Sequence, residues 1–238
     1  MTSRTPTVYR EIPRIAPDLL ASLAGLTVSD LHDALPPTVR SAALLGPALR
    51  PITPGLRVHG QAVTAFCAPG DSLMTHCALY LARPGDVLVI GNGGVPSGAL
   101  WGGNVAFDAK AHGIAGAIVD APVRDVAFIR KLQHPAWASA ISASRAEKRG
   151  LGTVNLPVAC GGTLVHPGDI VVADDDGVLI FAPEHLAVAV DKVRARIRDE
   201  TAMRRRIEAG ERLFDTQGFG KLLADAGIEI HAGLWRAD

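Results

Sequence analysis

The sequence predicts a mixed α/β protein, on three observations. Aliphatic runs follow two Pro-Gly-Asp turns, at residues 84–90 and 167–173, and are typical of buried strands that begin at a tight turn. Stretches with helical periodicity lie between the β-type runs along the chain. Aromatic residues make up only 5% of the 238 residues, so the core around these strands must be aliphatic.

The first two predicted elements are short helices. Residues 17–24 suit one helix, and Ser29 can cap a second that runs to Leu35, where Pro36-Pro37 ends it. The predicted strands lie at 61–68, 87–90, 115–119, 137–141, 157–165, 169–173 and 177–182, and two further helices at 99–112 and 125–132. Helical and β-type segments therefore alternate, as they do in α/β proteins.

A long helix is expected from Pro183 to Ala209. Its apolar stripe consists of Leu186, Val190, Val193 and Ile197. At 1.5 Å per residue this helix is roughly 40 Å long, and beyond the stripe come Glu200 and several arginines. Its distal half either meets another subunit or presents a solvated charged face. We divide the chain into one α/β catalytic domain with N-terminal helices, residues 1–182, and a helical extension between subunits, residues 183–238.

Composition and charge argue against several classes of protein. The 24 Lys and Arg balance 24 Asp and Glu, unlike the charge of a dedicated nucleic-acid binder or a polybasic membrane clamp. No run approaches the ~18 apolar residues of a membrane helix, and residues 1–13 contain no signal peptide. Cys67, Cys77 and Cys160 are odd in number and widely spaced, which favours free thiols. We expect a cytoplasmic protein with neither a nucleic-acid nor a membrane partner.

The neutral total conceals a local difference in charge. Residues 60–125 contain five acidic and three basic side chains, whereas residues 191–212 contain eight basic and five acidic ones. A basic helix that faces the acidic region of a second copy would favour a homo-oligomer, because complementary charges stabilise such contacts.

Two glycine-rich stretches differ in what they predict. Gly91-Asn92-Gly93-Gly94 follows a predicted strand but lacks the Gly-x-Gly-x-x-Gly spacing, because Pro96 takes the sixth position, which argues against a dinucleotide site. Gly98, Gly102 and Gly103 bracket the start of the next predicted helix. Free N–H groups at a helix start bind anions, so this second stretch predicts a carboxylate site.

Arg124 and Asp125 are the strongest candidates for chemistry. They follow the strand at 115–119, and ligands of α/β proteins gather where strands end beside helix starts. Arginine offers a planar fork of donors to an oxyanion, and aspartate a hard oxygen ligand to Mg²⁺. The alternative is a surface ion pair. No lysine lies in an apolar strand, where its pKa would fall enough for Schiff-base chemistry. If the reaction takes place at a carbon–carbon bond, we therefore expect a metal to serve as the electron sink.

Three further observations argue against other kinds of functional site. Asp174-Asp175-Asp176-Gly177 joins two predicted strands and lacks the terminal Glu of a calcium loop, so we interpret it as a hairpin turn. The histidines show no metal-ligand spacing. No Gly-x-Ser-x-Gly elbow supports Ser-His-Asp catalysis.

Several blocks of the sequence resemble one known family. They are residues 84–90, 102–113, 116–125, 151–158 and 167–178. Arg124-Asp125 and the Asp-Asp-Asp-Gly-Val run at 174–178 are the most specific motifs. On these residues the chain is similar to the RraA-like family, which contains 4-hydroxy-4-methyl-2-oxoglutarate aldolases, 4-carboxy-4-hydroxy-2-oxoadipate aldolases and regulators of ribonuclease E activity. Residues 204–210 and 221–227 resemble the carboxy-hydroxy-oxoadipate branch in particular.

The resemblance covers residues 8–228 and implies both a fold and an activity. The fold would be a layered αββα sandwich like the swivelling phosphohistidine domain. The activity would be that of a class II pyruvate aldolase that needs Mg²⁺ or Mn²⁺. It would cleave a 4-hydroxy-2-oxo di- or tricarboxylate to pyruvate and a 2-oxo acid, and would also decarboxylate oxaloacetate. Such proteins are homotrimers or homohexamers with sites between subunits.

The roles of individual residues also follow from the resemblance. Asp125 would bind the metal, and Arg124 would hold the 2-oxo oxygen. The backbone that would hold the pyruvate carboxylate consists of Gly102, Gly103, Asn104 and Val105. Asp33, and Glu200 from the long helix of a neighbouring subunit, would be catalytic residues that hold the water through which the proton moves.

One position departs from the aldolases. Where they read Phe-Gly-Asp/Glu-Leu-Leu, this chain reads Trp101 to Val105 as Trp-Gly-Gly-Asn-Val, so Gly103 replaces the acid that would orient metal-bound water. The departure favours, as one alternative, a relative with altered 2-oxo-acid chemistry. A second alternative is a non-catalytic regulator that binds a ribonuclease. Asp125 argues against it, because those regulators lack the Asp after the Arg.

Overall fold

The computed structural model describes residues 6–150 and 152–235. The chain divides into two compact units, Met1–Asp191 and Lys192–Asp238, whereas the sequence places the domain boundary at Ala182. Residues 1–5, at the start of the first predicted domain, and residues 236–238, at the end of the second, lie outside the described residues. Leu151, in one of the blocks that resemble the family, does so as well. The first unit therefore includes the beginning of the long helix.

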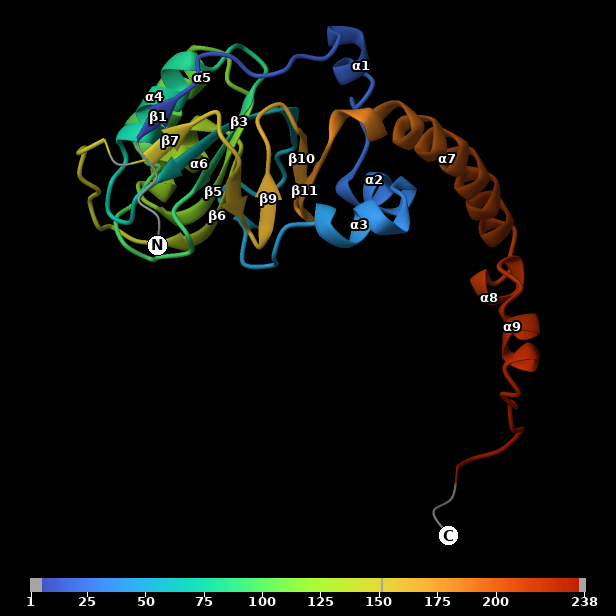
Figure 1. Cartoon of the computed structure of the whole chain (residues 1–238). Coiled ribbons are helices and arrows are strands. Elements are labelled where there is room, and N and C mark those ends of the chain that lie inside the picture. The colour runs from blue at the N-terminus through green and yellow to red at the C-terminus, as the bar shows by residue number, and fades with distance from the viewer. Residues whose placement is uncertain (1–5, 151, 236–238) are drawn as a thin grey trace. The chain divides into compact units, whose positions relative to one another are not determined.

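One branched sheet of nine strands forms the centre of the first unit (Figure 1). Its strands are β1 (Thr7–Val8), β2 (Arg50–Pro51), β3 (Val58–Cys67), β4 (Val87–Gly91), β5 (Gly116–Val123), β6 (Ala136–Ile141), β7 (Gly152–Val154), β10 (Ile170–Asp174) and β11 (Gly177–Phe181). The main path runs β1-β7-β3-β4-β5-β6-β2, and β10 pairs with both β3 and β11. Strands β3 to β6 run parallel to one another, so their carboxyl ends lie at one edge of the sheet.

Helices and one hairpin complete the described chain. The helices are α1 (Pro17–Ala21), α2 (Val28–Ala34), α3 (Pro37–Ala43), α4 (Leu73–Leu81), α5 (Gly103–Ala111), α6 (Val126–Leu132), α7 (Leu186–Glu208), α8 (Leu213–Thr216) and α9 (Phe219–Asp225). The hairpin pairs β8 (Val158–Cys160) with β9 (Thr163–Val165). The mixed α/β class and the long C-terminal helix are thus confirmed, while the likeness to the swivelling phosphohistidine domain stays an expectation.

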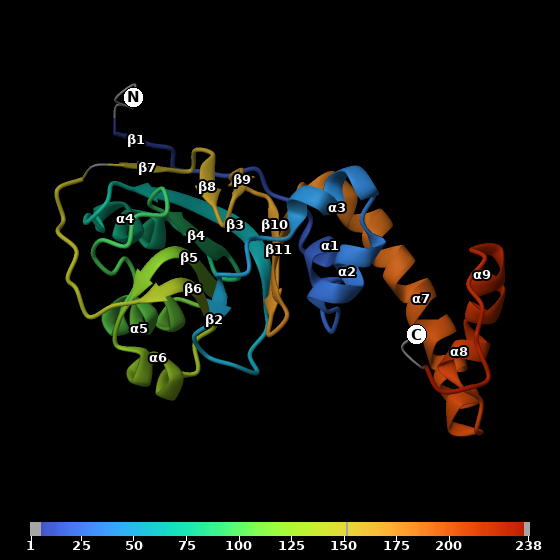
Figure 2. The ribbon, with the colours of Figure 1, turned by 90° about the horizontal axis from the view of Figure 1, so that it is seen from below.

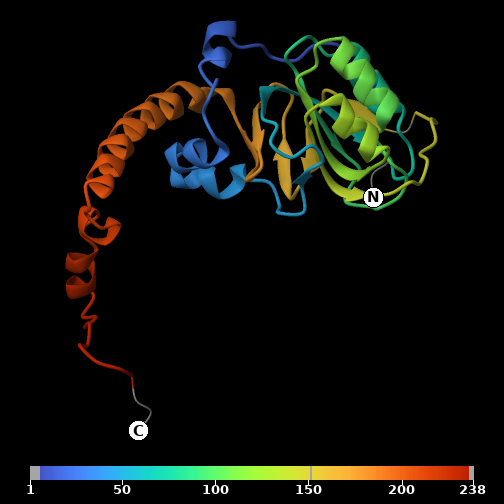
Figure 3. The ribbon, with the colours of Figure 1, turned by 180° about the vertical axis from the view of Figure 1, so that it is seen from behind.

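The two faces of the central sheet bury different residues, because side chains alternate along a strand. In β4, Leu88 and Ile90 pack into one aliphatic cluster, and Val87 and Val89 into another. Residues of α4, α5 and α6 belong to the first cluster, and residues of β10, β11 and the β8–β9 hairpin to the second. Helices α2 and α3 contact β11. Figures 2 and 3 show this order of layers from two further sides.

Helix α1 begins at Pro17, as predicted, but the second helix begins earlier than predicted. Thr27, not Ser29, caps α2: its side chain accepts from the Asp30 N–H, and the Asp30 side chain accepts from the Thr27 N–H in a capping box. The Ser29 hydroxyl instead donates to Asp176 at 2.7 Å. Pro36-Pro37 follows the end of α2, as predicted, but Pro37 also begins the unpredicted helix α3, because a proline in the first turn of a helix loses no hydrogen bond.

Three further elements differ from the prediction. Helix α4 has no counterpart among the predicted elements, because its nearly unbroken apolar sequence shows no polar face. The predicted strand at 157–165 is a hairpin, since Gly161-Gly162 has positive φ and forms a turn. Helix α5 begins at Gly103, because residues 99 and 101 form isolated β-bridges instead of helix.

The acidic run at 174–176 is a hairpin turn, as predicted, because β10 and β11 pair antiparallel on either side of it. Its carboxylates are engaged in hydrogen bonds that join separate parts of the first unit. Asp174 Oδ2 accepts from the Val28 N–H at 2.9 Å, and Asp175 accepts from the Gly55 N–H at 3.0 Å. The run therefore fixes α2 and the loop before β3 against the hairpin.

Helix α7 begins at Leu186 after a short 3-10 turn and ends at Glu208. Three residues of its predicted stripe, Leu186, Val190 and Val193, are buried, whereas Ile197 is 40% exposed. Exposed large apolar side chains of the second unit include Leu213, Phe214, Phe219, Leu222, Ile228 and Ile230. Among the residues that the structure describes, no helix has the length and apolar character needed to cross a membrane.

His134 makes the stability of the first unit depend on pH. Its ring is stacked on Trp101, with centroids 6.0 Å apart, and burial, followed by the charge of Lys110, lowers its pKa to about 4. As the pH falls below 6.5, the ordinary pKa of histidine, this side chain binds a proton in the unfolded chain but not in the folded one. The group therefore lowers stability progressively between these two pKa values, by roughly 2 kcal/mol near pH 4.5.

The substitution His134→Phe keeps an aromatic ring beside Trp101 and removes the titration. Urea unfolding at about pH 7 and pH 4.5 should therefore show a smaller loss of stability for the variant than for the wild type. An equal loss in both proteins would contradict the assigned pKa.

Candidate functional site

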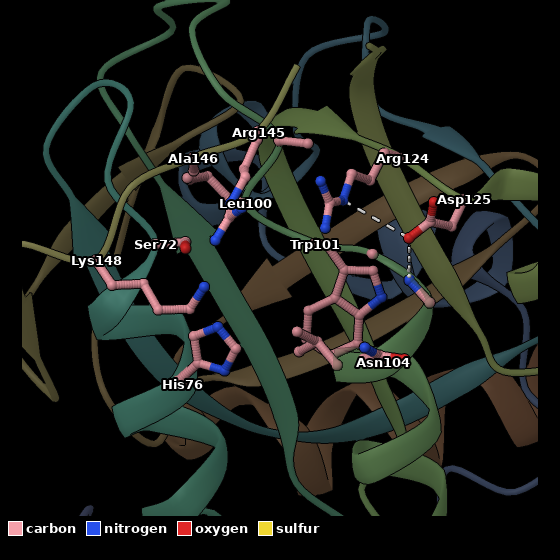
Figure 4. A pocket seen from close by; sticks show the side chains of 14 residues that line it. Ser72, His76, Leu100, Trp101, Asn104, Arg124, Asp125, Arg145, Ala146 and Lys148 are labelled. Atoms are coloured by element: carbon pink, nitrogen blue, oxygen red, sulfur yellow. Dashed lines mark hydrogen bonds and ion pairs between the residues drawn. The ribbon is translucent and has the colours of Figure 1, made fainter. Parts of the chain in front are cut away.

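A cavity of about 350 Å³ lies at the carboxyl edge of the parallel strands (Figure 4). It is lined by Ser72, His76, Ala99, Leu100, Trp101, Gly102, Gly103, Asn104, Val105, Arg124, Asp125, Arg145, Ala146 and Lys148. The chain segments that follow β3, β4, β5 and β6 each contribute part of this lining. Ligands of α/β proteins bind at this edge of the sheet, so the cavity is the candidate functional site.

Three segments cross at one wall of the cavity: residues 69–72, residues 97–101, and residues 142–150, which we call the strap. The Glu147 N–H of the strap donates to the Gly70 carbonyl at 2.7 Å, and the Ser72 N–H donates to the Glu147 carbonyl at 2.8 Å. A Cβ at Gly98 would lie 3.0 Å from Ala146 Cβ and 3.1 Å from Gly70 Cα. Only glycine permits so close a crossing, so the backbone itself fixes the strap.

Asp125 has a left-handed backbone, with φ 57° and ψ 34°, where β5 ends and α6 begins. Such strain in a non-glycine residue is often found at functional sites. Its Oδ2 accepts from the Gly103 N–H at 3.0 Å and lies 3.6 Å from Arg124 Nε. A Cβ at Gly102 would lie 3.1 Å from both Arg124 Cγ and Asp125 Oδ2, so glycine lets these two side chains approach the backbone closely. The structure brings the predicted Arg-Asp pair together at the cavity.

The first turn of α5 presents backbone N–H groups to the cavity. Asn104 and Val105 line it, and no acceptor in the described part of the chain takes their N–H groups, as is usual in the first turn of a helix. The Gly103 N–H, in contrast, donates to Asp125. Gly98 lies before this turn, at the crossing with the strap, so two amides rather than the whole glycine-rich stretch are available to an anion.

The cavity is cationic. Arg124, Arg145 and Lys148 line it, and Asp125 is the one acidic side chain among its described lining residues. His76 lies near Lys148 (Figure 4), and burial, followed by the charge of Lys148, lowers its pKa. Its ring therefore stays neutral near neutral pH. The net negative charge counted along residues 60–125 does not describe the cavity, because two of its cations come from the strap.

Sequence reasoning misses His76, Arg145 and Lys148. His76 lies on α4, which is not among the predicted elements, and the other two lie on the strap, which has little regular structure. The sequence does contain a signal that could have found the two strap residues. Basic residues follow the predicted strand at 137–141, and the ends of parallel strands lie at one edge of the sheet. The same rule that singles out Arg124 thus applies to the strap.

Asp33 and Glu200 are not among the residues that line the cavity. Asp33 lies on α2, with its carboxylate 3.8 Å from His32 Nδ1. Glu200 belongs to the second unit, where its carboxylate accepts from Arg196 at 2.7 Å and from Arg204 at 3.2 Å. Their predicted catalytic roles stay predictions, and the one for Glu200 requires a second copy of the chain.

Asp125 is the residue at which a divalent metal would bind. No group of three or more His, Cys, Asp or Glu side chains suited to a metal occurs in residues 6–150 or 152–235. Mg²⁺ tolerates such a site, because it keeps several waters and is often held by one or two carboxylates together with the substrate. Gly103 adds no ligand, and a Cβ there would lie 3.0 Å from Phe128 Cδ1. The residues present fit a hydrated Mg²⁺ or Mn²⁺, not a closed metal centre.

A cationic cavity at the carboxyl edge of a parallel sheet is typical of an α/β protein with a site for a small anion. The chain belongs to the RraA-like family: the family model described as Aldolase/RraA matches residues 28–180.

Two curated relatives are each similar to about two thirds of this chain. A protein of Halalkalibacterium halodurans, named provisionally as a 4-hydroxy-4-methyl-2-oxoglutarate aldolase, is 35% identical over 159 residues, which cover 67% of this chain and 76% of the relative. A protein of Burkholderia multivorans with the same provisional name is 37% identical over 156 residues, covering 65% and 94%.

Solved structures share the fold. RraAS2 of Streptomyces coelicolor, described as an unusual member of the RNase ES inhibitor RraA protein family, matches with a TM-score of 0.70 at 27% identity, covering 81% of this chain and 98% of its own. An uncharacterized protein of Pseudomonas syringae pv. tomato matches with a TM-score of 0.76 at 24% identity, covering 88% and 97%. At that identity the second likeness concerns the fold alone.

Proposed function

We propose that the chain is a divalent-metal-dependent class II pyruvate aldolase. Its substrate would be a 4-hydroxy-2-oxo di- or tricarboxylate, which it would cleave to pyruvate and a second 2-oxo acid. The observation that supports this best is the cavity in which Arg124 and Asp125 face two α5 amides and two further cations. The provisional aldolase names of relatives add support.

The lining suggests how such a substrate would be oriented. The carboxylate beside the 2-oxo group would accept from the N–H groups of Asn104 and Val105, which are aligned with the positive end of the α5 dipole. The Arg124 guanidinium would donate to the 2-oxo oxygen. Arg145 and Lys148 would hold the distal carboxylate. A substrate with at least two carboxylates would satisfy all these donors.

Cleavage of the C3–C4 bond requires that the C4 hydroxyl lose a proton and that negative charge develop on the 2-oxo oxygen. Arg124 is placed to stabilise that charge, because a fixed cation needs no reorganisation during the reaction. A Mg²⁺ or Mn²⁺ ion held by Asp125 would supply Lewis acidity at the same oxygen. A water held by Asp33 and Glu200, the latter from a neighbouring subunit, would receive the proton. We therefore expect a homotrimer or homohexamer.

Decarboxylation of oxaloacetate leads to the same pyruvate enolate, so one cavity would serve both reactions. A coupled assay with lactate dehydrogenase measures pyruvate release from 4-hydroxy-4-methyl-2-oxoglutarate, 4-carboxy-4-hydroxy-2-oxoadipate and oxaloacetate. We expect release that depends on added Mg²⁺ or Mn²⁺. Absence of pyruvate from every one of these acids would overturn the proposal.

Restoring an acid at position 103 should tighten metal binding. In Gly103→Asp the new carboxylate would stand beside Asp125, at a helix start that favours negative charge, after the Phe128 ring shifts by a few tenths of an ångström. We expect Mn²⁺ affinity to rise about tenfold, as measured by calorimetry without substrate. Gly233→Asp, at a glycine with open space around it, adds the same charge elsewhere and is the control. Unchanged or weaker binding in Gly103→Asp would show that the metal does not sit at Asp125.

A second candidate function has support from the solved relative described as belonging to the RNase ES inhibitor family. In that case the chain would bind a ribonuclease and would not act on a 2-oxo acid. A pull-down from lysate with and without Mg²⁺ separates the two. Specific capture of a ribonuclease by a protein that releases no pyruvate would favour the regulator.

A further inference from the structure

The Pro-Gly-Asp motif occurs three times, and its aspartate has different partners at the first site. In the second and third copies the carboxylate closes its own turn: Asp86 accepts from the Arg83 N–H at 2.7 Å, and Asp169 accepts from the His166 N–H at 2.7 Å. Asp86 also accepts from the guanidinium of Arg14, outside the cavity. A strand follows each of these two turns. In the first copy a helix follows, and the carboxylate of Asp71 accepts both from the first N–H of that helix and from backbone N–H groups far along the chain.

The two oxygens of Asp71 bind two different walls of the cavity. Oδ1 accepts from the Leu73 N–H at 2.9 Å, at the first residue of α4. Oδ2 accepts from the N–H groups of Arg149 and Gly150, at the end of the strap. Asp71 is only 3% exposed, so water hardly competes for these bonds. Asp71 thus joins the helix to a segment nearly eighty residues further along the chain.

Both of these walls supply the cavity with nitrogen-bearing side chains. Helix α4 supplies His76, and the strap supplies Arg145 and Lys148. In Figure 4 these groups and Ser72 lie on the opposite side of the cavity from Asp125. Long cationic side chains are flexible, so the position of their charge depends on the backbone from which they extend. The bonds of Asp71 fix that backbone on both sides.

We propose that Asp71 is a positioning residue that sets the distal, cationic end of the cavity and thereby its preference for substrates with a second carboxylate. The inference builds on the proposed function. A neutral amide cannot replace this carboxylate, because three N–H groups need two acceptor oxygens and Asn offers one. In Asp71→Asn either α4 or the strap loses its acceptor, while Arg124, Asp125 and the start of α5 keep theirs.

The test compares Asp71→Asn with Asp169→Asn in the full-length protein. The control changes the same motif at a similarly buried aspartate whose partners, such as His166, do not line the cavity. Two reactions are measured: metal-dependent release of pyruvate from a 4-hydroxy-2-oxo dicarboxylate, and exchange of pyruvate methyl protons for deuterium. The second reaction needs no distal carboxylate. Amide hydrogen exchange of the 142–150 peptide reports directly on the strap.

In Asp71→Asn we expect the KM for the dicarboxylate to rise about tenfold or more. The kcat and the rate of pyruvate proton exchange should stay within about twofold of wild type, and amide exchange in the strap should accelerate. The control should change none of these. An unchanged KM, or an equal loss of both reactions, would overturn the proposal in favour of a purely structural role.

Failure of the proposed function gives a different result. If the wild-type protein neither releases pyruvate nor exchanges its protons, the aldolase assignment is wrong. Binding of 2-oxoglutarate and of pyruvate by calorimetry, together with amide exchange, then tests Asp71 alone. Weaker binding of the dicarboxylate only, with a more mobile strap, supports the positioning role, and equal binding by wild type and variant refutes it.

Discussion

Replacing Arg124 with Ala is expected to lower the rate of pyruvate release by at least about 100-fold. The guanidinium lies beside Asp125, with Nε 3.6 Å from its carboxylate. It would face the oxygen on which charge develops as the C3–C4 bond breaks. Since this interaction is stronger in the transition state than in the ground state, the loss should appear chiefly in kcat.

Arg83→Ala is the matched control for Arg124→Ala. Arg83 is exposed and paired with Glu11 outside the cavity, so its loss removes one positive charge without touching the site. The coupled assay should show wild-type rates for this variant. A loss of less than about tenfold in Arg124→Ala would mean that another group stabilises the developing charge.

Asp125→Asn should abolish both metal binding and metal-dependent activity. Asparagine tolerates the left-handed backbone at this position, and its side-chain oxygen can still accept from the Gly103 N–H, so the fold should persist. An amide lacks the negative charge that a hard divalent cation requires. We expect Mn²⁺ binding, followed by calorimetry or electron paramagnetic resonance, to fall below detection, and pyruvate release to fall about 100-fold or more.

Asp108→Asn provides the comparison for Asp125→Asn. Asp108 is a largely exposed acid on α5, paired with His112, and does not line the cavity. Its removal should leave metal binding unchanged. Pyruvate release by Asp125→Asn at the wild-type rate, with or without added metal, would contradict both the metal site and its proposed role.

The longer strands of the central sheet could be predicted from local signals, whereas the two- and three-residue strands β1, β2 and β7 are not predicted. A Pro-Gly-Asp turn followed by an unbroken aliphatic run specifies β4 and β10, since both faces of these strands are buried. Helix α4 could not be predicted, because its burial against β3 and not an amphipathic pattern of its own stabilises it. Helix α3 is not predicted, because the Pro36-Pro37 pair that follows the end of α2 also provides the first residue of the next helix.

The candidate site, like the fold, has one part that local sequence patterns predict and one part that depends on tertiary contacts. Arg124, Asp125 and the α5 amides are adjacent in sequence to glycines and strand ends, so motif and topology rules find them. Arg145 and Lys148 reach the cavity only because the strap crosses Gly70 and Gly98, a tertiary contact without a local pattern. The sequence therefore suggests an anion site but not its cationic distal end.

Exchange of the methyl protons of pyruvate for deuterium, followed by proton NMR, tests the central claim most directly. The reaction needs only enolate formation in the cavity and does not depend on which hydroxy acid is the natural substrate. The account predicts exchange that requires Mg²⁺ or Mn²⁺, persists in Arg83→Ala, and is lost in Arg124→Ala and Asp125→Asn. No exchange above the rate without protein, or exchange that is equally fast in those two variants, would contradict it.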